Sequence, residues 1–340
     1  MLGRIFKFGL AGALAAAMVM SFPVPGSAGM REAKKEGSIL WYSSLSLPIA
    51  QAVCNLYNSK KLGVKCILHR SGSGKLYRRY LQESKGGIYK ADVMHTSNLG
   101  HFLNMRAKKI LVKYVPKGIG NFNPKFKTDH GYWTILRASM LVPFYNTKNV
   151  KAADAPKSWK DIIDPKWQGK IVHSHPSYSG FVTNGMINIV KLHGWDYYKK
   201  MAALKPRIMQ SALGGIPIVA TGEADIGAGT VLYGLFAAIK KGEPVQVIIP
   251  TEGVPLVTSP NSILAKAPHP NAAKAFTDFL FSKETQQLLA NRFLHVGHPG
   301  VKYPKGLPAL SDFKLMTISG KELKKENKPT RKMFRKLFGV

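Results

Sequence analysis

Hydrophobic positions after residue 37 fall into two alternating patterns. Short apolar runs with the character of strands are followed by longer segments whose apolar residues recur at helical spacing. The predicted strands lie at residues 39–42, 64–68 and 91–97, where the last range includes the polar residues that end the strand. The predicted helices lie at residues 48–58, at residues 76–83 and through Phe102 and Met105. This order predicts an α/β fold with parallel strands.

A serine- and glycine-rich turn lies between the second of these strands and the helix that follows it. Residues 70–75 read Arg-Ser-Gly-Ser-Gly-Lys, and Leu76 and Tyr80 then recur at helical spacing. The first N–H groups of a helix are unpaired and carry partial positive charge, so the turn suits an anionic oxygen. The spacing fits neither the Walker nor the Rossmann nucleotide pattern. A tight turn that only caps the helix is the alternative.

The same arrangement recurs later in the chain. Ser177, Tyr178, Ser179 and Gly180 directly precede an amphipathic helix predicted over residues 181–192. In open parallel sheets, ligands gather at the carboxyl ends of strands. The polar residues expected at such ends are Ser43, Ser44, Ser71, Ser73, Thr96 and Ser97. Two helix tips of this kind, facing each other across a cleft, would hold one anion from both sides.

The N-terminus has the pattern of a secretory signal peptide. Basic residues precede a short apolar run, and small residues follow it up to residue 28. We expect residues 1–28 to be removed and the mature chain to work in the periplasm, with an uncleaved anchor as the alternative. The only cysteines, Cys54 and Cys66, lie on a predicted helix and the next strand. An oxidising compartment favours a disulfide between them, and two buried thiols are the alternative.

The charge balance is strongly basic. The 340 residues include 50 Lys and Arg against 18 Asp and Glu, a formal net charge of +32. Such a charge is compatible with nucleic acid, an anionic membrane surface or an anionic ligand. The basic residues are scattered, and no recognition-helix or RNA-binding signature accompanies them, so no specific nucleic-acid partner is expected. We interpret the charge as a solvated surface that steers anions inward.

The sequence contains few patterns that indicate catalysis or metal binding. No G-x-S-x-G elbow, paired carboxylates or cysteine with a basic partner is apparent, so we expect no enzyme activity and no cofactor. An exported hydrolase is the catalytic alternative. His173 and His175 lie two apart at a strand end but lack accompanying carboxylates, so a structural role is expected for them. His175 is also a candidate to touch ligand.

The order of several short motifs resembles the periplasmic solute-binding proteins of ABC importers. The subfamily is the one with ferric-iron, hexose-phosphate and 2-aminoethylphosphonate binders. The motifs lie at residues 42–44, 71–83, 91–93, 109–116, 142–147, 156–161, 164–170, 268–276 and 279–286. The resemblance implies a type II fold of two α/β lobes joined by hinge strands near residues 137–147 and 252–265. Lobe 1 would comprise residues 29–137 and 265–340, and lobe 2 residues 138–264.

The resemblance also implies a ligand contact near residues 222–234. Ferric-binding members carry adjacent tyrosines there, because phenolate oxygens suit Fe(III), whereas this chain has Tyr233 followed by Gly234. Tyr233 would then contact the organic part of a ligand together with Tyr42. Packing of Tyr233 on its own helix is the alternative. Lys75, Arg70 and Arg137 are candidates to add charge.

These observations predict a monomeric, non-catalytic receptor that delivers a small anionic solute, bearing phosphate, phosphonate or carboxylate, to a membrane ABC permease. A ferric-iron carrier and an exported polyanion-binding protein are the alternatives. Residues 323–340 are expected to form a closing helix docked on lobe 1, with a membrane-surface helix as the alternative. The predicted ligand-binding residues are Tyr42, Ser43, Ser44, Ser71, Gly72, Ser73, Gly74, Ser97, Ser177, Tyr178, Ser179, Gly180 and Tyr233.

Overall fold

The computed structural model describes residues 25–128 and 130–340, so most of the predicted signal peptide lies outside the described residues. The first lobe, which contains β1 to β3, begins with alternating helices and strands, as predicted. Its parallel order β2-β1-β3 places the ends of β1 and β3 side by side. The elements are α1 (Pro25–Glu36), β1 (Ser38–Ser43), α2 (Leu47–Ser59), β2 (Lys65–Arg70), α3 (Ser73–Lys85), β3 (Val93–His95) and α4 (Leu99–Ala107).

The second lobe, which contains β5 to β7, repeats this design with the parallel order β7-β5-β6. The helix predicted over residues 181–192 is confirmed as α5. The elements are β5 (Ile171–Ser174), α5 (Gly180–His193), α6 (Asp196–Ala203), β6 (Arg207–Met209), α7 (Gly215–Ala220), β7 (Ile226–Val231), α8 (Leu232–Lys240) and β8 (Val245–Val247).

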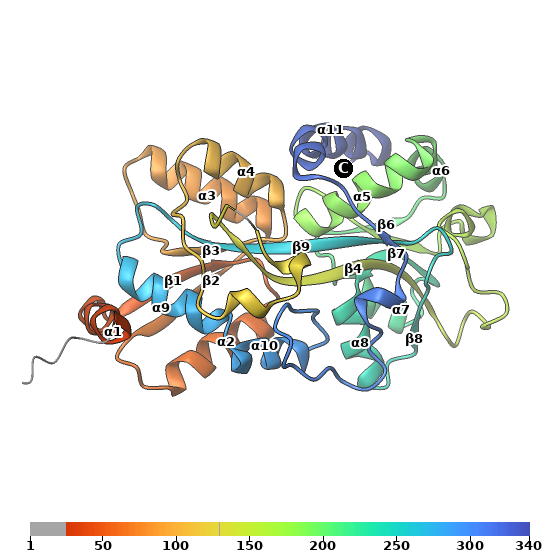
Figure 1. Cartoon of the computed structure of the whole chain (residues 1–340). Helices are drawn as coiled ribbons and strands as arrows, with labels where there is room; N and C mark the ends of the chain where they lie inside the picture. The colour runs from red at the N-terminus through yellow and green to blue at the C-terminus, as the bar shows by residue number, and fades with distance from the viewer. Residues whose placement is uncertain (1–24, 129) are drawn as a thin grey trace, which may run out of the picture.

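Two long antiparallel strands, β4 (Thr134–Asn146) and β9 (Val254–Ile263), join the lobes (Figure 1). β9 pairs with β3 at one end, whereas β4 pairs with β7 and β8 at the other. Every residue of β4 is buried, which explains its almost continuous apolar sequence. Residue boundaries between the lobes at 137/138 and 264/265 stay a prediction.

Helices cover both faces of the joined sheets (Figure 1). In the first lobe, Trp41 of β1 packs edge-on against Phe276, which also contacts Tyr57 of α2. The structure joins Cys54 of α2 to Cys66 of β2 in a disulfide. The later elements are α9 (Pro270–Leu280), α10 (Lys283–Ala290), β10 (Leu315–Met316) and α11 (Gly320–Phe338), and the short 3-10 helices are η1 (Ile119–Asn121), η2 (Pro124–Phe126), η3 (Lys160–Ile163), η4 (Pro165–Trp167) and η5 (Leu310–Asp312).

The C-terminal helix α11 does not dock on the first lobe alone, so that prediction was wrong. Leu323 near its start is buried beside Gly100 of α4. Phe334 near its end is fully buried against the rings of His173 and His175 in the second lobe. With 19 residues the helix is about 28 Å long, which is enough to reach from one lobe to the other.

Candidate functional site

The first side of the site is the turn from β2 into α3. Gly72 is the N-cap of α3, and Ser73 is its first residue. The Ser73 hydroxyl lies 2.9 Å from the Ser97 hydroxyl, and the Ser97 N–H points at both Ser44 Oγ and Ser73 Oγ. The ends of β1 and β3 and the start of α3 therefore bring three serines into one cluster, as the parallel strand order predicts.

The second side is the turn from β5 into α5. Ser179 is the N-cap of α5, and its Oγ accepts a hydrogen bond from the Val182 N–H at 3.3 Å. The turn itself is held by His175, whose Nδ1 accepts from the Ser177 N–H at 2.9 Å. Thr183 Oγ1 donates to the Pro176 carbonyl at 2.8 Å. Residues 175–183 thus form a braced loop that presents the start of α5.

The two helix tips touch each other. A methyl group on Gly72 would lie 2.4 Å from the Tyr178 carbonyl oxygen, so only glycine permits this approach. A methyl group on Gly180 would lie 3.2 Å from the Ser73 Cβ atom and 2.8 Å from that of Asn98. The turns of the two lobes, more than 100 residues apart in sequence, therefore face each other as predicted from their shared pattern.

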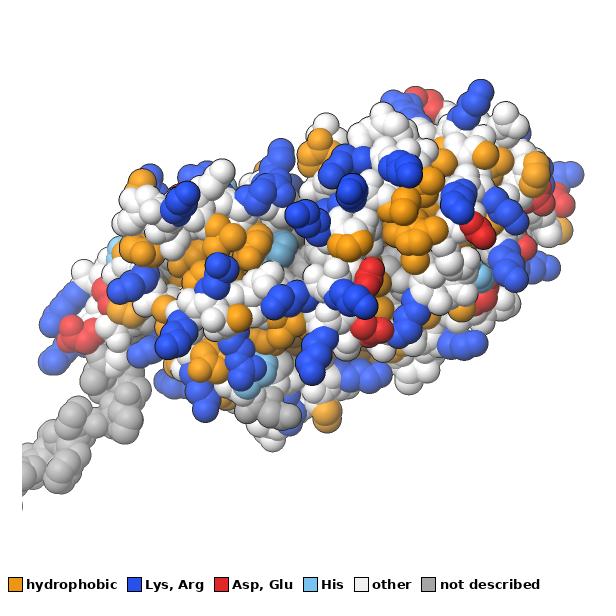
Figure 2. Space-filling model, turned by 90° about the horizontal axis from the view of Figure 1, so that it is seen from above, with side chains coloured by type: hydrophobic (Ala, Val, Ile, Leu, Met, Phe, Trp, Pro, Cys, Tyr) orange, Lys and Arg blue, Asp and Glu red, His pale blue; other side chains and the backbone are white. Residues whose placement is uncertain are grey.

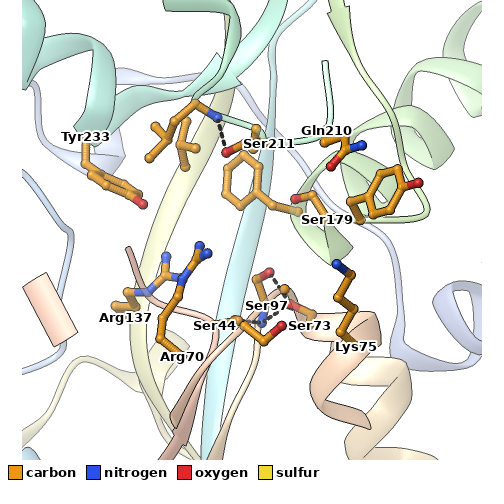
Figure 3. A pocket seen from close by; sticks show the side chains of 17 residues that line it. Ser44, Arg70, Ser73, Lys75, Ser97, Arg137, Ser179, Gln210, Ser211 and Tyr233 are labelled. Carbon is orange, nitrogen blue, oxygen red and sulfur yellow. Dashed lines mark hydrogen bonds between the residues drawn. The ribbon is translucent and has the colours of Figure 1, made fainter. Parts of the chain in front are cut away.

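A cavity of about 280 Å³ lies between the lobes, next to the contact of the two tips (Figure 3). Its walls come from both lobes and from the strand β4. Figure 3 shows Ser44, Ser73 and Ser97 on one side and Ser179, Gln210 and Ser211 on the other. The lining residues are Ser44, Arg70, Ser71, Gly72, Ser73, Lys75, Ser97, Arg137, Tyr178, Ser179, Phe181, Gln210, Ser211, Ala212, Leu213, Val231 and Tyr233.

Three cations line this cavity, and no carboxylate does so among the described residues. Arg137 of β4 is only 3% exposed, and its Nε and Nη1 atoms have no hydrogen-bond partner in the described structure. Burial lowers the pKa of its guanidinium, which lies 5.9 Å from the Tyr233 ring. Arg70 lies beside it in Figure 3, with Nε donating to the Leu45 carbonyl at 3.0 Å. Lys75 lies over the Tyr178 ring at 5.7 Å.

Some predicted residues lie near the cavity without lining it. Tyr42 is fully buried, and its hydroxyl lies 3.0 Å from both carboxylate oxygens of Glu83. Burial and the Glu83 carboxylate raise the pKa of Tyr42 to about 12. The Ser43 hydroxyl pairs with His95 Nδ1 at 3.1 Å. The remaining three, Gly74, Ser177 and Gly180, belong to the touching tips but not to the wall.

Other wall residues were missed by the sequence reasoning. Gln210 and Ser211 lie between β6 and α7, where no motif marks them. Phe181 is the second residue of α5, and its sequence context predicts only an amphipathic helix. Arg137, in contrast, was among the candidate cations, and it is the only charged residue in the otherwise apolar or small-polar run of β4.

The histidines do not assemble a metal centre in the described part of the chain, where no group of three or more His, Cys, Asp or Glu residues has a suitable arrangement. Burial lowers the pKa of His173 to about 4, so its ring stays neutral against Phe334. Among the described residues, none of the helices combines the length and apolar character that crossing a bilayer requires.

The fold and the interlobe cavity define a type II periplasmic binding protein. Residues 90–325 match the family of bacterial extracellular solute-binding proteins, and the chain belongs to this family of ABC importer components. Its relatives include the Fe(3+)-binding periplasmic protein of Serratia marcescens, 23% identical over 93% of this chain and 91% of that protein.

Solved structures share the fold across nearly their whole length. The periplasmic binding protein AfuA from Actinobacillus pleuropneumoniae has a TM-score of 0.80 at 22% identity, covering 89% of this chain and 99% of AfuA. Iron-bound HitA from Pseudomonas aeruginosa has a TM-score of 0.76 at 21% identity, covering 88% and 99%. The predicted two-lobed fold and the family resemblance are thereby confirmed.

Proposed function

We propose that this protein captures a small organic anion between its lobes and, as a non-catalytic monomer, delivers it to an ABC permease. The anion carries a phosphate, phosphonate or carboxylate group. The observation that carries the proposal is the Arg137 guanidinium, which is buried at the cavity with two unpartnered nitrogen atoms. A buried charge is costly unless it is paired, and an anionic ligand supplies the pair.

The surroundings of Arg137 favour an oxyanion over other ligands. Arg70 and Lys75 bring further positive charge, while the serine hydroxyls provide donors that can turn towards ligand oxygens. Because Lys75 and the arginine pair lie on different sides of the serine cluster in Figure 3, the site suits a solute with polar groups at more than one end. AfuA, the neighbour described above, was solved with fructose-6-phosphate, which is a solute of this kind.

Ferric iron is the second candidate, because relatives and neighbours are named for it. Fe(III) prefers anionic oxygen ligands. Tyr178 and Tyr233 are the tyrosines of the wall, and each lies beneath a cation. Neither carboxylate nor histidine joins them among the described lining residues. This charge distribution opposes a bare ferric ion and admits iron only within a chelate of net negative charge.

A thermal-shift panel tests the proposal. It contains phosphorylated sugars, phosphonates, dicarboxylates, ferric citrate, citrate alone and a ferric salt. We expect one organic anion class to raise the Tm saturably in the wild type and in Arg292→Met, an exposed-arginine control, but not in Arg137→Met. A response to ferric salt with a tyrosinate absorption band that Tyr233→Phe removes would establish the iron carrier instead. Tight, salt-sensitive heparin binding with no panel response would establish a polyanion-binding protein.

A further inference from the structure

A second cavity of about 250 Å³ lies beneath α11, where this helix faces α3 and α4. It shares no lining residue with the interlobe cavity, although Gly74 of its wall adjoins Ser73 of the other. All the charged side chains of its wall are Lys or Arg, and no Asp or Glu lines it in the described structure. The side chains that carry the argument are Arg78, His101, Lys324, Lys328 and Arg331.

Two guanidinium groups of this wall converge on one point. Nη1 of Arg78 and Nη1 of Arg331 both come within 4 Å of the place that a methyl group on Gly74 would occupy. Burial and the charges of Arg78 and Arg335 lower the pKa of Arg331 to about 10. None of these three arginines forms an ion pair with a carboxylate of the described residues. No ion pair of the described residues therefore offsets their mutual repulsion.

Unpaired polar atoms border the same cavity. Nη2 of Arg331 and Nδ1 of His101 are both buried without a hydrogen-bond partner among residues 25–128 and 130–340. His101 is only 5% exposed and stacks on Tyr77 with 4.3 Å between ring centres. Buried polar groups are nearly always paired, so these atoms indicate a partner other than the described residues.

We propose that this cavity is a second anion site, which binds a small free oxyanion such as inorganic phosphate through Arg78, Arg331 and His101. Convergent guanidinium donors suit the several oxygens of such an ion. Arg331 also lies 3.4 Å, Nε to Oγ1, from Thr183 of α5, and Arg335 Nη1 lies 3.4 Å from Ser177 Oγ. An oxyanion held here joins α11 to the first lobe at the point where α11 also contacts the second.

The test measures phosphate binding by calorimetry at constant ionic strength. The Arg137→Met background removes a main cation of the interlobe cavity, so the second site can be followed separately. We expect saturable binding in this background, unchanged by adding Lys332→Met, an exposed charge removal on the same helix. Adding Arg331→Met should weaken the affinity about tenfold or more, as expected for losing a charge-assisted hydrogen bond.

Folding is checked through thermal unfolding without phosphate. Removing one of several repelling cations should leave the Tm of Arg331→Met equal to or above that of its background. If the Arg331→Met protein does not fold, Arg78→Met should weaken phosphate binding in the same way and takes its place in the test. The absence of saturable phosphate binding in the Arg137→Met background, or equal phosphate affinity in the Arg331→Met and Lys332→Met proteins, would overturn the proposal.

Discussion

Replacing Arg137 by methionine separates two consequences of burying a charge. The side chain is almost fully buried, and two of its nitrogen atoms lack partners among the described residues. Methionine is adaptable, uncharged and of similar volume, so it can fill most of the same space. We expect the variant to be more stable than the wild type without solute, and to bind the solute far more weakly.

The burial of the guanidinium determines how large the changes in stability and in solute affinity should be. Exchanging buried ionic groups for apolar side chains of similar volume is neutral or stabilising by about 1–4 kcal/mol. Since Arg137 borders a cavity, we expect the lower part of this range. A hydrogen bond from a charged group contributes about 1.5–3 kcal/mol. The loss of two such bonds to the solute raises Kd by roughly 10²- to 10⁴-fold.

Urea unfolding without solute and calorimetric titration with the solute from the panel measure the two effects. Arg292→Met removes an exposed arginine and should change neither quantity. Two results would each refute the reasoning. One is an Arg137→Met protein that is clearly less stable than the wild type without solute, and the other is a variant that binds the solute with wild-type affinity.

Three further predictions follow from packing, cross-linking and protonation. Gly72→Ala should cut solute affinity more than tenfold because its methyl group meets the Tyr178 carbonyl, whereas Gly86→Ala, with no contact closer than 3.6 Å, should bind normally; titration of both decides this. Reducing the Cys54–Cys66 disulfide should lower the free energy of unfolding by about 3 kcal/mol in urea, and an unchanged midpoint would contradict it. Burial lowers the pKa of His173 to about 4, so on acidification this histidine is protonated in the unfolded chain before it is protonated in the folded one. The free energy of unfolding should therefore fall by up to about 3 kcal/mol between about pH 6.5 and pH 4. His173→Phe should reduce this dependence of the free energy of unfolding on pH.

The helix tips could be predicted from the sequence because their chemistry is local. Serine and glycine at a strand-to-helix turn define both the N-cap and its free donors, and the structure has helices beginning at Ser73 and Gly180. The parallel strand order then accounts for the cluster of Ser44, Ser73 and Ser97.

The rest of the cavity depends on distances that local pattern does not contain. Tyr42 was expected in the cavity, but its hydroxyl bonds to Glu83 of α3, a pairing between residues 41 apart. Gln210 and Ser211 reach the cavity from a loop whose path is set by the packing of the second lobe. Arg137 is the instructive case, because a single cation in a buried strand indicates a functional charge before any fold is known.

The scattered Lys and Arg side chains fit the interpretation that the surface charge attracts anionic solutes towards the protein. Figure 2 shows Lys and Arg spread over the face seen from above, with few acidic side chains among them. A net charge of +32 raises the local concentration of anions around the molecule. This long-range field weakens with salt, whereas the buried Arg137 contact is screened far less. Salt should therefore slow solute association more than it speeds dissociation.

Two opposing free-energy contributions of α11 act on the observed arrangement, in which the two helix tips touch. Fully burying Phe334 against the second lobe contributes about 2–3 kcal/mol, while Leu323 holds the other end of the helix on α4. In the predicted hinge motion about β4 and β9 the lobes separate, so α11 must then release one of these contacts or slide. The convergence of Arg78, Arg331 and Arg335 at the same seam opposes closure, because like charges approach in a partly buried space. An oxyanion bound in the second cavity, as proposed above, would cancel that repulsion and leave the apolar contacts intact, so it should favour the arrangement in which the two lobes touch.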